Sequence, residues 1–214
     1  MPKVVNHDER RVEIAHATWA AVQSVGVDKL TLRDITLEAG CTTGVLSHYF
    51  KDKDSVLRFA FTIAYRKTFE RILNANKSIK SNLLCIRNAM VELLPDPKKL
   101  ESVAFVSMCF GIRNSNDPLL TEEYNANKNE YRDLLKKYIT NSIKKEEIPR
   151  VRKTEDILDL ILAVVDGVCI QSLLSPEVYT KKRCVRIIES MVERLPGSSN
   201  QTSCTSSPEK ILND

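Results

Sequence analysis

A run of small and hydrogen-bonding side chains lies between residues 42 and 49 and is suited to contacts with DNA. Hydroxyl, imidazole and phenol groups can bond base edges in the major groove and phosphate oxygens. Leu46 and Phe50 interrupt the run four positions apart, the spacing of one helix face. The pattern predicts a helix of about seven residues, anchored on one side and available to a ligand on the other. The available positions are Thr42, Thr43, Gly44, Val45, Ser47, His48 and Tyr49.

The residues just before this helix are those needed to position it. Thr31 can cap a preceding helix, and Asp34 three residues later makes a variant of the capping box. Ala39 is small where two helices must approach, and Gly40 can make the turn between them. Together the two helices have the shape of a helix-turn-helix, and Gly44 would keep the backbone slim where it meets DNA.

Residues from about 10 to 57 resemble the DNA-binding domain of TetR-family transcriptional repressors. The string 43–54 is especially similar to the betaine-regulator-like branch of that family. The matching residues are Gly26, Thr31, Ile35, Ala39, Gly40, Gly44, Leu46, Tyr49, Phe50, Lys53 and Leu57.

The resemblance implies that the short helix enters the major groove. It assigns phosphate contacts to Thr31 and to Lys53, which begins the next helix, where amides and the helix dipole favour an anion. Ser47 stands where many family members have tyrosine, and Cys41 where valine or isoleucine is usual. The predicted DNA-binding residues are Thr31, Arg33, Thr42, Thr43, Gly44, Val45, Ser47, His48, Tyr49 and Lys53.

The composition favours long helices in compact domains. The chain has 214 residues, 43% of them hydrophobic, with only 6 glycines and 8 prolines, too few for a turn-rich sandwich or barrel. The net charge of +4 is spread nearly evenly and permits a polyanionic partner without requiring one. We expect an all-α fold of about nine helices. Their approximate ranges are 8–25, 31–39, 43–49, 53–75, 81–94, 98–113, 118–145, 155–175 and 176–195.

This layout predicts a three-helix DNA-binding domain over 1–55, a helical ligand-binding and dimerisation domain over 56–195, and a polar, disordered tail over 196–214. The helix over 155–175 is apolar nearly all round and needs cover on every side, so we expect a homodimer through residues 155–195. The resemblance also implies a small-molecule effector. Weak candidates for its contacts are Phe105, Met108, Cys109, Tyr131 and Asp166.

Asp166 and the tyrosines leave two interpretations open. Asp166 lies within the apolar helix and is either a paired or interface aspartate or a counter-ion for a cationic effector. Tyr124, Tyr131 and Tyr138 recur every seven residues, which is more typical of core or dimer packing than of an aromatic cage. Tyr49, likewise, could belong to the core instead of the groove.

Other classes of protein have less support. No apolar segment of a secretion signal follows the N-terminus, and the apolar run 157–170 looks too short and too charged to span a bilayer. We therefore expect a cytoplasmic protein with reduced thiols and no membrane contact. No nucleophile–base pair, phosphate loop or metal-ligand spacing is visible, so we expect neither an enzyme nor a bound metal or cofactor. The main alternative is a helical small-molecule-binding or protein-interaction module without DNA binding.

Overall fold

The computed structural model describes residues 7–96, 99, 102, 118–150 and 152–197. Throughout these residues the regular structure is helical, apart from an isolated bridge between Asp96 and Lys99. The predicted all-α class is confirmed, and the helix expected over 98–113 lies outside the described residues except for Lys99 and Ser102. The helices are α1 (His7–Val25), α2 (Leu32–Glu38), α3 (Thr43–Tyr49), α4 (Lys53–Asn76), α5 (Asn82–Glu92), α7 (Pro118–Lys144), α8 (Thr154–Leu174) and α9 (Lys181–Glu193).

Side-chain caps fix the short helices at the positions that the sequence predicts. Thr31 and Asp34 form a reciprocal capping box at α2, and Thr42 accepts a hydrogen bond from the amide of Val45 at α3. Gly40, in the turn between them, has φ +56°, a left-handed backbone conformation that residues with a side chain rarely adopt. The helix-turn-helix is therefore set largely by local chemistry.

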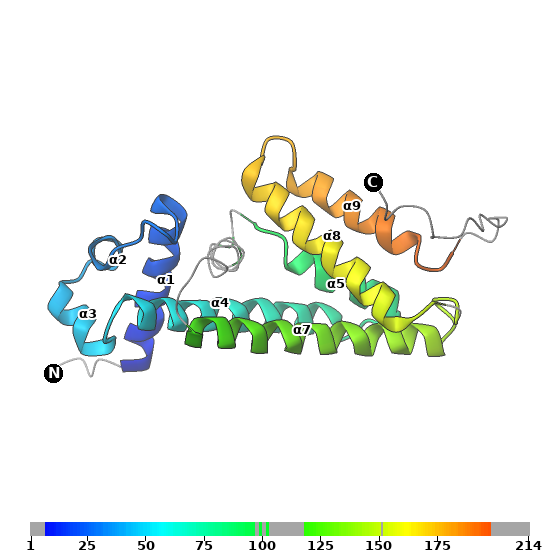
Figure 1. Ribbon diagram of the computed structural model, residues 1–214, viewed down its shortest axis with the longest axis horizontal. Coiled ribbons are helices and arrows are strands. Elements are labelled where there is room, and N and C mark those ends of the chain that lie inside the picture. Colours follow the sequence, from blue (N-terminus) through cyan, green and yellow to red (C-terminus); the bar gives the residue numbers. More distant parts are fainter. Residues whose placement is uncertain (1–6, 97–98, 100–101, 103–117, 151, 198–214) are drawn as a thin grey trace, which may run out of the picture.

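Helix α4 joins two buried clusters of side chains (Figure 1). Its first half, from Val56 to Ala64, packs with α1, α2 and α3 to form the head. Its second half contributes Ile72 to the core of the bundle that α5, α7, α8 and α9 complete. Figure 1 shows α4 beside α7, with the head at one end and the α8–α9 pair displaced toward the other. The predicted domain boundary after residue 55 falls in the first turn of α4 and stays a prediction.

The bundle differs from expectation at the start of α9. The sequence pattern placed this helix from Pro176, but the amides of Val178 and Tyr179 both bond the carbonyl of Ser175 in a turn. Thr180 then caps the helix, which begins at Lys181. Cys184, Ile188 and Met191 of α9 are buried on one stripe, and Leu195 just after the helix continues it.

Helix α8 is unusually apolar and only partly covered. Among the described helices it alone has the length and hydropathy that could cross a membrane, so the expectation that this run is too short and too charged does not hold. A core helix passes the same test, and α8 packs against α7 and α9. Only 39% of its most apolar window is buried within the single chain, and Leu160 and Leu174 are exposed.

Candidate nucleic-acid interface

Helix α3 divides into an anchored side and an open side. Leu46 and Phe50 are 1% and 5% exposed within the core of the head, as their spacing predicts. Around them, Thr42, Thr43, Gly44, Val45, Ser47 and His48 are exposed, and Tyr49 is half-buried. Figure 1 shows α3 at the outer edge of the head, away from the bundle. The open side thus presents a short, mainly polar strip that a DNA groove could receive.

The two capping threonines differ in what they can offer to a phosphate. Thr31 is exposed, but its hydroxyl donates to Asp34 Oδ2 at 2.6 Å and its amide donates to the same oxygen at 2.8 Å. These hydrogen bonds hold the pKa of Asp34 below its usual value. The Thr42 hydroxyl only accepts, from the Val45 amide at 3.3 Å, so its hydrogen is left to donate. A phosphate contact from Thr31 would have to compete with its own capping box.

Lys53 is half-buried at the first position of α4, beside a helix terminus that already carries a carboxylate. Asp52 accepts a hydrogen bond from the Ser55 amide at 2.8 Å, and this bond lowers the pKa of Asp52. The anion-binding capacity of this terminus is therefore shared with Asp52. A phosphate at this terminus would therefore depend mainly on the Lys53 ammonium. Arg33, on α2, is exposed.

The start of α1 packs against the far end of α3, which sequence reasoning missed. The His7 ring lies 5.5 Å, centroid to centroid, from both His48 and Tyr49, and those two rings are 5.1 Å apart. One turn later, Arg10 Nη2 lies 3.5 Å from the carbonyl of Ala39. These contacts join residues 29 to 42 positions apart, so no local spacing could have revealed them.

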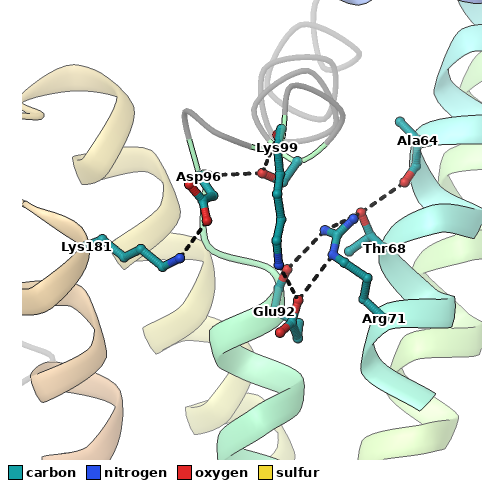
Figure 2. Close-up of polar contacts among 8 residues, drawn as sticks. Ala64, Thr68, Arg71, Glu92, Asp96, Lys99 and Lys181 are labelled. Carbon is teal, nitrogen blue, oxygen red and sulfur yellow. Dashed lines mark hydrogen bonds and ion pairs between the residues drawn. The ribbon is translucent and has the colours of Figure 1, made fainter. Parts of the chain in front are cut away.

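Polar contacts link α4 to the bundle on its other side (Figure 2). Arg71 Nε and Lys99 Nζ donate to the same oxygen of Glu92, at 3.1 and 3.3 Å. Nearby, Lys181 Nζ lies 2.6 Å from Asp96 Oδ2, so the start of α9 is tied to the segment after α5. Closer to the head, the Tyr65 hydroxyl donates a hydrogen bond to Glu130 on α7. Burial raises the pKa of Tyr65, and this hydrogen bond raises it further. Through these contacts, a displacement of α5 or α7 would also displace α4.

The effector candidates are placed unevenly. Phe105, Met108 and Cys109 lie outside the described residues. Tyr131 is buried in the bundle core, where burial raises its pKa, and its hydroxyl has no partner within the described part of the chain. Asn127, one turn earlier, has a buried amide nitrogen that likewise finds no partner within the described residues, and no sequence pattern points to it. Asp166 is exposed on the single chain and close enough to Tyr131 to contribute to that pKa shift.

The other tyrosines of the stripe pack as predicted. Tyr138 packs against the bundle core, and its hydroxyl accepts a hydrogen bond from Asn76 Nδ2 at 3.3 Å. Tyr124 packs against the head, 6.4 Å from the ring of Phe61. The described residues contain no cluster of three metal-ligating side chains, and Cys41, Cys85, Cys169 and Cys184 are free thiols.

A groove of about 660 Å³ runs between α8 and α9. Its floor is apolar, with Leu160, Val164, Ile187, Met191 and Leu195. Four arginines line it as well: Arg152, Arg183, Arg186 and Arg194. Helix α8 carries four acidic residues and no basic one, whereas α9 begins with three consecutive basic residues. The groove between α8 and α9 is thus apolar with a basic edge. Two of the acidic residues of α8, Glu155 and Asp159, form ion pairs with Arg132 and Lys136 of α7 instead.

Known proteins with the same sequence features are bacterial transcription regulators. The family model for bacterial regulatory proteins of the tetR family matches residues 14–58, and that for the C-terminal domain of BetI-type transcriptional repressors matches 86–197. The HTH-type transcriptional regulator PksA of Bacillus subtilis is 28% identical over 202 residues, 91% of this chain and 94% of PksA. BetI of Yersinia pestis is 25% identical, with 91% and 96% covered.

Solved structures show the same fold. A putative transcriptional regulator from Saccharomonospora viridis, in complex with choline, superposes with a TM-score of 0.78 at 18% identity, covering 87% of this chain and 97% of that one.

Proposed function

Because the chain belongs to the TetR family of bacterial regulatory proteins, with a C-terminal domain of the BetI type, we propose that it represses transcription as a homodimer on a palindromic operator. As a member of this family it is a DNA-binding regulator and not an enzyme. The finer assignments below concern which surfaces it uses. A regulator with this function would work in the bacterial cytoplasm, where its operator DNA lies.

The observation that carries the proposal is the open side of α3. Two buried anchors leave six neighbouring positions exposed, and a capped, seven-residue helix holds them in a fixed orientation. We assign base contacts to Thr42, Thr43, Val45, Ser47 and His48, and groove-edge contacts to Tyr49. Lys53, with Arg33 and Thr31 on α2, would contact phosphates. Because Thr31 is already bonded to Asp34, Lys53 should contribute more than Thr31 to affinity.

The α8–α9 face supports the dimer. A second copy would cover the exposed apolar residues of α8, Leu160 and Leu174, which the single chain leaves open. Asp166, exposed on the single chain, would then be an interface aspartate. Two heads related by this symmetry would meet half-sites about one helical turn, or a multiple, apart on the DNA.

An effector would bind within the bundle. Tyr131 and Asn127 each leave a buried polar atom unpaired in the described residues, and such atoms are costly unless something bonds them. A ligand that bonds both would be favoured over the empty bundle. Helix α4 is tied to α5 by the contact between Arg71 and Glu92 (Figure 2) and to α7 by the hydrogen bond between Tyr65 and Glu130, and so offers the mechanical route from that ligand to the heads.

Electrophoretic mobility shifts on DNA upstream of the chain's own gene test the DNA-binding surface. We expect a sequence-specific, salt-sensitive shift that Tyr49→Ala and Lys53→Ala each weaken about tenfold, within the usual range for one base or phosphate contact. The side chains of Tyr49 and Lys53 are both half-buried, so the temperature of thermal unfolding should change little. Loss of folding in Tyr49→Ala would mean that Tyr49 belongs to the core. Absence of any specific shift with the wild-type protein would refute the proposed function.

A further inference from the structure

His7 lies outside the helix-turn-helix, yet its ring is part of the same surface as the end of α3. It is the first residue of α1 and is exposed to solvent. Its ring meets His48 at 48° and Tyr49 at 49°, while His48 and Tyr49 meet edge to face at 84°. Each of the three rings therefore contacts the other two, in a geometry that favours aromatic packing.

The two side chains at the end of α3 differ in their other support. Tyr49 is half-buried and packs against the core of the head, whereas His48 is exposed. An exposed side chain on a short helix samples several rotamers, and each one that must be frozen on binding lowers the affinity. Packing of the His7 ring against both side chains restricts them before DNA arrives.

The neighbouring residues of α1 keep His7 in place. Arg10 reaches the carbonyl of Ala39 at the end of α2, and Arg11 lies over the rings of Phe50 and Phe59 at 5.1 and 4.5 Å. The first two turns of α1 are thus held against both sides of the helix-turn-helix. His7 has a rigid base from which to act.

We propose that His7 is a positioning residue for DNA recognition, which orders His48 and Tyr49 for the operator through ring packing. The inference rests on the proposed function of α3 as the reading helix. The start of α1 would then help to determine operator affinity and selectivity, although the His7 ring acts only through His48 and Tyr49.

The test measures operator affinity by fluorescence anisotropy for His7→Ala and His7→Phe. We expect His7→Ala to weaken binding about three- to tenfold, the range of one or two lost ring contacts, and His7→Phe to restore most of the affinity. His16→Ala is the matched control, because it removes an imidazole from the same helix nine residues later, where the ring contacts Trp19 instead of α3. That variant should bind DNA as the wild type does.

A double-mutant cycle separates positioning from general stability. If His7 acts through its partners, His7→Ala should have little further effect in a protein that already carries His48→Ala and Tyr49→Ala. Wild-type affinity in His7→Ala, equal losses in His7→Ala and His7→Phe, or additive losses in the cycle would each overturn the inference. Wild-type protein that binds no operator would instead refute the proposed function, so the two failures are distinguishable.

Discussion

Gly44 offers the sharpest test of the reading surface, because one methyl group should move stability and DNA affinity in opposite directions. Gly44 is the second residue of α3, and its backbone does not have the positive φ that would require glycine. A Cβ built there meets only Thr42 Oγ1, at 3.8 Å, which is an ordinary contact. Nothing inside the described protein therefore explains a glycine at this position.

Within the protein alone, Gly44→Ala should be favourable. Alanine is preferred over glycine in a helix by about 0.5–1 kcal/mol, chiefly because it restricts the unfolded chain. For a chain of this length, that gain corresponds to a rise in Tm of about 1–4 °C. Thermal unfolding followed by circular dichroism measures it directly.

Against DNA, the same methyl group should be unfavourable. If α3 lies in the major groove with Gly44 against the DNA, the added carbon displaces the helix and weakens its base contacts. A disturbed base contact costs about 1–3 kcal/mol, which is about a 5- to 150-fold loss of operator affinity. Binding to unrelated DNA, which depends on phosphates, should change much less. Gly44→Ser should behave in the same direction.

Two results would refute this reasoning. Unchanged operator affinity in a folded Gly44→Ala protein would mean that Gly44 does not approach DNA. A fall in Tm would mean that the space around Gly44 is needed by the protein itself.

Three further predictions concern the bundle. Leu160→Glu places a charge on the exposed face of α8 and should convert the dimer to a folded monomer in analytical ultracentrifugation. Leu84→Glu, at a similarly exposed position on α5, should leave the dimer intact. A dimeric Leu160→Glu protein would contradict the assigned interface. Tyr131→Phe removes an unpaired buried hydroxyl and should raise Tm by about 2–6 °C in a thermal scan, whereas Tyr138→Phe loses its bond with Asn76 and should lower it; a fall for both would show that the Tyr131 hydroxyl is satisfied. Burial acts to raise the pKa of Glu147, but hydrogen bonds from Ser142 and from the start of α5 hold it below the ordinary value of 4.5. The stabilisation from ionised Glu147 is therefore present above about pH 4.5 and lost as pH falls. Glu147→Gln should lower Tm by about 2–4 °C at pH 7 and by much less at pH 3.5. An equal difference at both pH values would disprove this role of the Glu147 charge.

The head could be predicted from the sequence because local chemistry determines most of it. Thr31, Thr42 and Asp52 each cap a helix through a residue three positions away, and such pairs can be read directly from the chain. The start of α9 was misplaced for a related reason. Pro176 is compatible with a first helical turn, but the stronger cap is Thr180, and the intervening residues bond back to Ser175.

The contacts between distant segments could not be predicted from the sequence. The ring of His7 meets His48 only because α1 crosses the end of α3, and the Asn127 amide is unpaired only because of how the bundle packs around it. The exposure of Asp166 has another origin. It lies on a face of α8 that the rest of the described chain leaves open, so a single sequence could show its charge but not its surroundings.

The shared helix α4 also determines how the protein can be divided. Five buried side chains of the head come from α4 after residue 55: Val56, Leu57, Ala60, Phe61 and Ala64. Trp19 of α1 bonds the backbone of this same stretch, at Ala60, with an N–O distance of 3.0 Å. A fragment ending at residue 55 would therefore lose one wall of its core and should not fold. The smallest autonomous DNA-binding fragment would extend to at least Ala64, into the helix that also contributes Ile72 to the bundle core.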